Sequence, residues 1–344
     1  MIIVITKQKA KKEKYNMCTS IFTRTKDQKH LLARTMDFSY PLNVAPIYIP
    51  RDYLWTSASD QKIWRNQLGF LGTGEQISGN YFVSDGVNEA GISIAELYLP
   101  GEAVYQKEAE TDKINICPHE FILWVLGNIQ SLDALEEQLP LINLVSRPVP
   151  ELGFVTPLHW IISDKNGRAI VIEPTEKELY FKENPVRVMT NTPHLEWHIQ
   201  NLRNYLGAQP KQLSSVTFDS FEATPFSQGT GTSSLPGGYT PPERFVRAAF
   251  FKEYINQAKN EEEGVMNALN ILATVSIPKG IVLKETGEQD YSQFISVMCN
   301  ETKSIYYKDY NSNSVTKAMI TEKLLEESTV QKFPVDRNLI IKSV

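Results

Sequence analysis

Cysteine, long apolar runs and excess positive charge are all scarce in this sequence. Its 344 residues include three cysteines, Cys18, Cys117 and Cys299, and this odd, low count provides neither a disulfide framework nor paired zinc ligands. No segment approaches the roughly 20 consecutive apolar residues of a transmembrane helix. The formal net charge of −5 differs from the basic character of nucleic-acid binders. We therefore expect neither a membrane nor a nucleic acid as a partner.

Signature motifs of several common sites are also missing. There is no G-x-S-x-G motif of serine hydrolases. His119 is not followed by the second histidine of H-E-x-x-H, and His159, His194 and His198 form no metal-ligand pattern. For His159 a hydrogen-bonded structural role is favoured. The glycine-rich segment 228–238 lacks the flanking strand and helix of a phosphate-binding loop. We expect no cofactor and no metal.

The first 17 residues differ in composition from the rest. An apolar MIIVIT precedes the lysine-rich KQKAKKEK, the reverse of the order in a signal peptide, so we expect no signal peptide and a cytoplasmic protein. Met17 stands directly before Cys18, which suggests that residues 1–17 are a removable extension or a mis-assigned start. A basic, solvated arm is the alternative. No linker divides residues 18–344, which we expect to form a single domain.

Strand patterns occur in adjacent pairs, and helical patterns occur between the pairs. An Asn-Gly turn between residues 159–163 and 168–173 is typical of a β-hairpin. Further hairpins are predicted for 19–23 with 30–34 and for 294–298 with 304–308. Helices are predicted over 118–129, 132–139, 194–205, 242–254 and 261–272. The absence of a strand–helix alternation argues against a doubly wound parallel sheet and for an α+β fold.

Cys18 is the main candidate nucleophile. If the chain is cut before it, one residue carries both a thiol and a free α-amine. The amine, with an ordinary pKa of about 7.7–8.0, is partly neutral near pH 7 and can accept the thiol proton. It can later return that proton to a leaving amine, so no catalytic histidine is needed. The alternative is a buried structural cysteine, which is the commoner role of a free thiol.

Five separated motifs resemble the choloylglycine hydrolase family. They are MCTS at 17–20, LARTMDF at 32–38, DGVNEAG at 85–91 followed by LY at 97–98, VMTNTP at 188–193, and TPPERF at 240–245. The family consists of N-terminal-nucleophile (Ntn) hydrolases of linear amides and includes bile salt hydrolases and penicillin V acylases. The resemblance implies an Ntn-hydrolase four-layer αββα sandwich, with two antiparallel sheets between helical layers. It also implies a small-molecule amide substrate and a homotetramer.

The resemblance also assigns roles to individual residues. Cys18 corresponds to the nucleophile, and Asp37 to the carboxylate that holds its α-amino group. Arg34 corresponds to an arginine beside the thiol, where a fixed positive charge favours thiolate, and Arg244 to a second arginine of the site. Asn191 corresponds to a side chain of the oxyanion hole. Each residue also has a structural alternative: a turn aspartate for Asp37, a surface ion pair for Arg34, and a helix-start residue with ordinary salt bridges for Arg244. For Asn191 the alternative, a turn asparagine before Thr192-Pro193, is favoured without the resemblance.

Tyr98 corresponds to the other oxyanion-hole position, where the main-chain N–H acts. Penicillin V acylases usually carry tyrosine there and bile salt hydrolases asparagine, so the sequence favours a penicillin V acylase. If Glu243 points into the pocket beside Arg244, its charge also disfavours anionic substrates. The alternatives are a conjugated bile salt hydrolase, an N-acyl homoserine lactone acylase and, from another class, a non-catalytic binding protein with the same fold.

Overall fold

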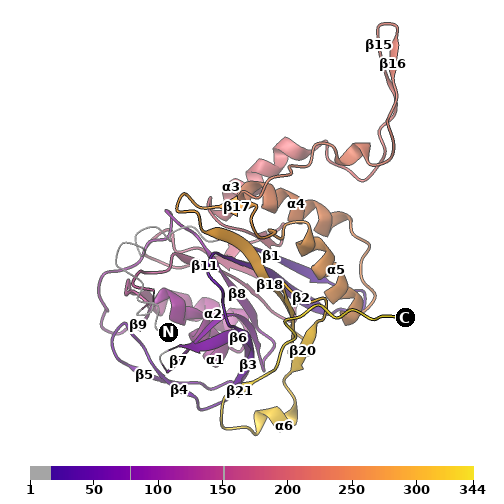
Figure 1. The fold of residues 1–344 in the computed structure, drawn as a ribbon. Coiled ribbons are helices and arrows are strands. Elements are labelled where there is room, and N and C mark those ends of the chain that lie inside the picture. Colours follow the sequence, from indigo (N-terminus) through magenta and orange to yellow (C-terminus); the bar gives the residue numbers. More distant parts are fainter. Residues whose placement is uncertain (1–16, 78, 150–151) are drawn as a thin grey trace.

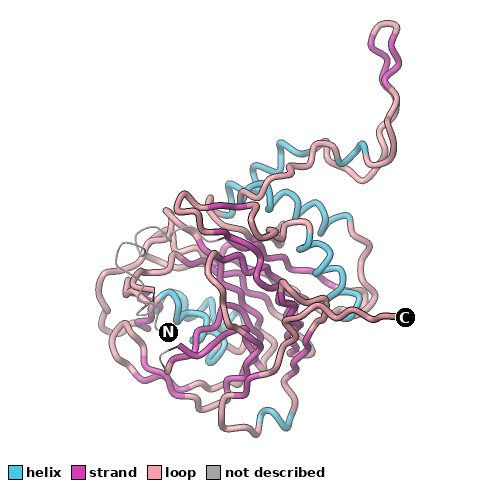
Figure 2. The backbone as a smooth tube through the Cα atoms, in the orientation of Figure 1, coloured by secondary structure: helices cyan, strands magenta, loops and turns pink. Residues whose placement is uncertain are grey.

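Two antiparallel sheets lie face to face in the computed structural model, which describes residues 17–77, 79–149 and 152–344. The predicted removable extension therefore lies outside the described residues, apart from Met17. Strand β1 of the first sheet contacts β8 of the second, and β18 and β19 contact β7 and β6. Figures 1 and 2 show the sheets stacked at the centre of the molecule with helices outside them.

The first sheet has seven strands in the described residues and carries the two predicted hairpins from the ends of the chain. In spatial order its strands are β14 (Val188–Met189), β1 (Met17–Arg24), β2 (His30–Phe38), β18 (Gln289–Cys299), β19 (Ser304–Asp309) and β20 (Thr316–Met319), with β17 (Val282–Leu283) beside β18. Strand β2 continues to Phe38, beyond the predicted end at residue 34, because it pairs with β1 on one side and β18 on the other. This extension places Asp37 in the same sheet as Cys18.

The second sheet has eight strands in the described residues. In spatial order they are β13 (Lys182–Glu183), β12 (Ala169–Ile172), β11 (Leu158–Ser163), β8 (Ser93–Tyr98), β7 (Asn80–Asn88), β6 (Phe70–Ile77), β3 (Ala45–Ile49) and β21 (Gln331–Lys332). The predicted Asn-Gly hairpin joins β11 and β12, and Gly167 has a φ of +83° in its turn, a conformation that suits glycine. Small ribbons are formed by β4 (Leu54–Thr56) with β5 (Ile63–Arg65) and by β9 (Ile114–Ile116) with β10 (Ile142–Leu144).

Helices cover the outer face of each sheet. The α-helices of the described residues are α1 (Phe121–Asn128), α2 (Leu132–Gln138), α3 (Leu195–Asn201), α4 (Pro241–Tyr254), α5 (Glu261–Ala273) and, near the end of the chain, the short α6 (Glu322–Leu325). Helix α1 packs on β7 and β8, whereas α4 and α5 pack on β1. The layers are thus helix, sheet, sheet, helix, which confirms the predicted αββα sandwich.

The predicted helix starts are also found. Ser131 accepts a hydrogen bond from the main-chain N–H of Ala134 at 3.1 Å and caps α2. At α4, Thr240 and Glu243 form a capping box. Among the described residues, no helix combines the length and apolar character of a membrane span.

One hairpin lies outside the two stacked sheets and their helices. Strands β15 (Val216–Phe218) and β16 (Phe221–Ala223) form a hairpin at the end of a long excursion between α3 and α4, and it projects away from both sheets (Figure 1). Its strands pair only with each other. We refer to residues 206–240 as the arm.

Candidate active site

Cys18 is the second residue of β1 and is buried at the edge of a cavity of about 450 Å³. The cavity lies where β1 and β2 approach the end of β8. Its wall is mainly apolar and includes Met36, Phe38, Val44, Val83, Leu152 and Leu158. A thiol at the edge of a mainly apolar cavity is compatible with the predicted role of Cys18 toward an amide that carries an apolar acyl group.

Arg34 contacts the Cys18 thiol directly. Its Nη2 lies 2.9 Å from Sγ, and its Nη1 donates to Asp85 Oδ2 at 3.3 Å. Both side chains of this ion pair are completely buried, so Arg34 is not the surface residue of the alternative interpretation. Asp85 therefore holds the guanidinium in place through Nη1, and Nη2 faces the Cys18 sulfur.

The positive charge of Arg34 is only one of the influences on the pKa of the Cys18 thiol. Burial raises the pKa of Cys18, and this outweighs the lowering by the positive charge of Arg34. Asp37 acts in both directions, because its carboxylate raises this pKa and its main-chain N–H lowers it. The thiol is therefore protonated at neutral pH, and its activation requires a base.

Asn191 holds the main chain of Cys18. Its Oδ1 accepts hydrogen bonds from the Cys18 main-chain nitrogen at 2.9 Å and from Arg244 Nη2 at 2.7 Å. Its Nδ2 donates to the carbonyl oxygen of Tyr98 at 2.8 Å. The Asn191 amide thus links β1, β8 and α4, and it is a buried junction rather than an ordinary turn residue.

Asp37 lies in the same sheet as Cys18 and close to its thiol. In the structure the Cys18 nitrogen is part of the peptide bond to Met17, and its side-chain acceptor is Asn191. The Asp37 carboxylate accepts hydrogen bonds from Ser292 Oγ at 2.5 Å and Thr35 Oγ1 at 3.2 Å, and it lies 3.9 Å from Arg244 Nη1. In the β1–β2 pair Met17 stands opposite Asp37. That Asp37 holds the free α-amine of a chain cleaved before Cys18 stays a prediction.

Arg244 is a fully buried cation that binds the same residue from the helical layer. From the first turn of α4, its Nη1 donates to the Cys18 carbonyl oxygen at 2.5 Å and to Thr19 Oγ1 at 2.6 Å. Arg244 therefore fixes the start of β1 and is not an ordinary surface residue at a helix start.

Glu243, the next residue, does not face the cavity. Its carboxylate accepts hydrogen bonds from Thr240 Oγ1 at 2.6 Å and from the Gly238 main-chain nitrogen at 3.1 Å. These bonds lower the pKa of Glu243, the Thr240 hydroxyl making the largest contribution. The expectation that Glu243 disfavours anionic substrates was therefore wrong, because its charge caps the helix.

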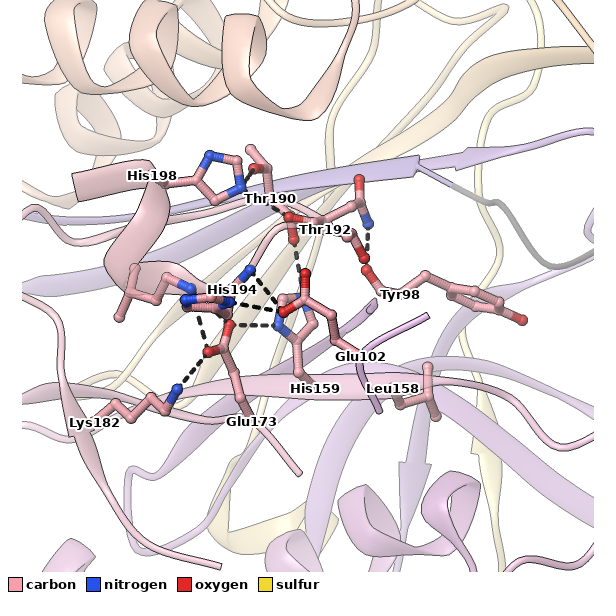
Figure 3. Close-up of polar contacts among 12 residues, drawn as sticks. Tyr98, Glu102, Leu158, His159, Glu173, Lys182, Thr190, Thr192, His194 and His198 are labelled. Atoms are coloured by element: carbon pink, nitrogen blue, oxygen red, sulfur yellow. Dashed lines mark hydrogen bonds and ion pairs between the residues drawn. The ribbon is translucent and has the colours of Figure 1, made fainter. Parts of the chain in front are cut away.

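Tyr98 lines the cavity with its ring and binds Asn191 with its carbonyl oxygen (Figure 3). The ring packs edge to face against Phe38, with 6.0 Å between centroids. Tyr98 is the last residue of β8, at the point where the sheet opens onto the cavity. Tyr98 thus lies at the cavity, and the role of its main-chain N–H in an oxyanion hole stays a prediction.

A buried polar network behind Asn191 was not foreseen from the sequence (Figure 3). His198 Nε2 lies 2.8 Å from the Asn191 carbonyl oxygen, and His159 Nε2 lies 2.9 Å from that of Thr190. Burial lowers the pKa of His198 to about 4. Its imidazole is therefore neutral and carries its proton on Nε2, which donates to the carbonyl.

His159 is held in turn by Glu173. His159 Nδ1 lies 3.2 Å from Glu173 Oε1, and Lys182 Nζ donates to Glu173 Oε2 at 2.9 Å. Glu173 also accepts the main-chain N–H of Leu195 at the start of α3. The predicted structural role of His159 agrees with these bonds, but its partners are 14 and 31 residues away and have no sequence signal.

The candidate residues thus converge on one place. Cys18, Arg34, Asn191, Arg244 and Tyr98 are joined by direct contacts, and Asp37 lies behind them through Arg244.

Comparison with known proteins gives a consistent result. Residues 18–333 match the family described as linear amide C–N hydrolases, choloylglycine hydrolase family. A bile salt hydrolase/transferase of Clostridium perfringens is 33% identical over 328 residues, covering 95% of this chain and 100% of the relative. A crystal structure of a mutant conjugated bile acid hydrolase from C. perfringens superposes with a TM-score of 0.88 at 32% identity, over 95% of this chain and 99% of the other. A penicillin V acylase of Pectobacterium atrosepticum is 23% identical over 248 residues, covering 67% of this chain and 60% of the relative.

Proposed function

The chain belongs to the choloylglycine hydrolase family of linear amide C–N hydrolases, and we propose that it hydrolyses the amide bond of conjugated bile salts. The observation that carries this proposal is the similarity to a bile salt hydrolase/transferase over the whole length of that relative. The penicillin V acylase matches less of the chain at lower identity. The relatives therefore favour a conjugated bile salt hydrolase, which the sequence indicated as an alternative, over the leading prediction of a penicillin V acylase.

The cavity is compatible with this substrate class. A bile salt combines a large, rigid, mainly apolar acyl group with a glycine or taurine amide. A cavity of about 450 Å³ with a largely apolar wall suits such an acyl group and places its carboxyl end near Cys18.

The proposed mechanism uses the α-amine of Cys18 as the base. The amine takes the thiol proton, and the sulfur attacks the substrate carbonyl carbon. The tetrahedral oxyanion is bound by the main-chain N–H of Tyr98 and by the N–H of Asn191 that does not bind the Tyr98 carbonyl. The protonated amine then gives its proton to the leaving nitrogen, and the C–N bond breaks. Water hydrolyses the Cys18 thioester with the amine again as base.

This mechanism requires removal of residues 1–17, and we propose that the active domain begins at Cys18. The family match also begins at this residue. Intact-mass spectrometry of active enzyme should show a chain that starts at Cys18. A fully active preparation that retains Met17 would contradict both the maturation and the role of the amine.

A penicillin V acylase is the second candidate, because Tyr98 occupies the position that differs between the two branches and lines the cavity. An N-acyl homoserine lactone acylase is a third. The test is the ratio of kcat/KM for glycocholate and penicillin V, with an N-acyl homoserine lactone in the same panel. We expect the largest value for glycocholate. A higher value for penicillin V would reject the bile salt proposal and retain the amidase.

The panel also tests the rival from another class, a non-catalytic binding protein. Matured Cys18→Ala protein is the control for background hydrolysis. If the wild-type protein releases no more amine than this variant from any substrate, the binding protein is the better description.

A further inference from the structure

Two carboxyl groups, those of Glu96 and Glu75, line the mainly apolar cavity, and the proposed mechanism uses neither. Glu96 is on β8, two residues before Tyr98. Its main-chain oxygen accepts a hydrogen bond from Arg34 Nη2 at 3.3 Å, and the same nitrogen lies 2.9 Å from Cys18 Sγ. The main chain of Glu96 is therefore anchored beside the thiol, and its side chain lines the cavity.

The Glu96 side chain is polar but incompletely satisfied. Trp160 stands opposite Glu96 on the neighbouring strand, and its indole N–H lowers the pKa of the Glu96 carboxyl. Neither Glu96 Oε2 nor the indole nitrogen makes a hydrogen bond of normal geometry, although both atoms are buried. Burial raises the pKa of Glu96 to about 8 in spite of the nearby Arg34 charge. At neutral pH the group is therefore mainly a carboxylic acid, which can donate one hydrogen bond and accept others. A buried polar group without a partner is costly unless a ligand supplies one.

We infer that Glu96 is a specificity-determining residue that binds a hydroxyl group on the acyl part of the substrate. The inference deepens the proposed function and rests on it. A hydroxyl can both donate to and accept from the acid, which completes its hydrogen bonding. An ammonium group would be repelled by Arg34, and a carboxylate would meet a second cavity carboxyl, Glu75.

Pairs of substrates that differ by one acyl hydroxyl test this inference. Glycocholate and glycodeoxycholate form one pair, and 4-hydroxyphenoxyacetyl and phenoxyacetyl amides form another. We expect wild-type kcat/KM to favour the hydroxylated member of the cleaved pair roughly five- to a hundredfold, the range for one buried, otherwise unpaired polar group. Glu96→Leu should remove this preference, because leucine has a similar size and no hydrogen-bonding atoms, whereas Glu96→Gln should keep most of it.

Glu75→Gln is the matched control. Glu75 lines the same cavity, and burial raises its pKa, but its carboxylate already accepts a hydrogen bond from the Asn43 main chain. This variant should keep the wild-type ratio between the two substrates. A loss of preference in the control equal to that in Glu96→Leu would assign the effect to the cavity as a whole and overturn the inference.

A second measurement keeps the inference separate from the proposed function. Calorimetric titration of wild-type, Glu96→Leu and Glu96→Gln proteins with the free acids of both pairs reports acyl binding without catalysis. If the protein does not cleave bile salts but shows a Glu96-dependent preference in the phenoxyacetyl pair or in acid binding, only the proposed substrate class is rejected. The role of Glu96 is then retained. An unchanged preference in Glu96→Leu, in rates and in binding, would overturn the role of Glu96.

Discussion

At the scale of single residues, the reactivity of Cys18 depends on how its own nitrogen is held. The thiol is kept protonated by burial although Arg34 is in contact with it. In the uncleaved chain this nitrogen is a peptide N–H that donates to Asn191 Oδ1, and Arg244 donates to the same oxygen. A peptide nitrogen cannot act as a base, so the proposed mechanism requires cleavage before Cys18 to convert it into an amine.

Replacing the nucleophile gives the most direct prediction. Cys18→Ser should fold, because the side chain changes by one atom, and it should lose at least about a hundredfold in kcat, since a hydroxyl ionises far less readily than a thiol. The measurement is kcat on correctly trimmed protein, with the thermal midpoint as the control for folding. Near wild-type turnover in the trimmed variant would reject Cys18 as the nucleophile.

Asn191→Ala should affect turnover more than substrate binding. The proposed oxyanion forms only after the ground state, so kcat should fall by roughly 10²–10³ while KM changes little. The variant also leaves Arg244 and the Cys18 nitrogen without their acceptor, so we expect a lower free energy of unfolding as well. Steady-state kinetics at a temperature well below the melting point separate the two effects. A rise in KM at constant kcat would make Asn191 a substrate-binding residue.

At the scale of elements, local sequence signals predicted the hairpins and the helix starts. They did not predict contacts between residues that lie far apart in the sequence. The Asn166-Gly167 turn and the helix start at Ser131 depend on residues only a few positions away, so the hairpin and the helix could be predicted from local sequence. The acceptor of the Cys18 nitrogen lies 173 residues away, and its identity depends on how β14 docks beside β1. The family motifs indicated Asn191 as a site residue but not this contact with the peptide nitrogen of Cys18.

The network behind β14 gives a prediction about pH and stability. Burial alone would raise the pKa of Glu173, but His159 and Lys182 lower it to about 2. A carboxyl whose pKa is lower in the folded state stabilises the protein above its unfolded pKa, near 4.5, and this stability is lost as the pH falls toward 2. The contribution is about 3 kcal/mol.

Glu173→Gln tests this contribution. At pH 6 the variant should be less stable than the wild type by about 3 kcal/mol or more, because His159 and Lys182 lose a buried anion. The difference in the free energy of unfolding should shrink as the pH falls from 5 to 3. Urea unfolding across this range provides the measurement, with Glu196→Gln, an exposed partner of the same Lys182, as the control. A difference independent of pH would show that the charge of Glu173 contributes nothing.

At the scale of the whole molecule, the site exists only because the two sheets stack. Cys18 and Arg34 come from one sheet, Tyr98 and Glu96 from the other, and Arg244 from the helical layer outside the first. The αββα arrangement followed from the family resemblance, whereas strand pairing alone indicated only an α+β fold. The cavity and its carboxyl groups could not be predicted, because they depend on long-range strand pairing, including the bulge in the β6–β7 pair between Thr73 and Gly74.

The arm lies outside the αββα sandwich, and its strands pair only with each other. Its hairpin exposes Phe218 and Phe221 by 64% and 67%, and Phe226 nearby is fully exposed. A two-stranded ribbon is marginally stable alone in water, and grouped exposed aromatic side chains are typical of interaction sites. We therefore propose that the arm packs on another copy of the chain and holds together the homotetramer that the resemblance implied.

A double substitution, Phe218→Asp with Phe221→Asp, should separate the copies without unfolding the body. Sedimentation velocity should give an oligomer for the wild type and a monomer for the variant, because the introduced charges would have to be buried in the interface. Met266→Asp is the matched control, since Met266 is exposed by 57% on α5 and lies outside the arm. It should keep the wild-type mass. A monomeric wild type would refute the homotetramer, and a variant that still assembles would show that the aromatic tip of the arm is not the contact.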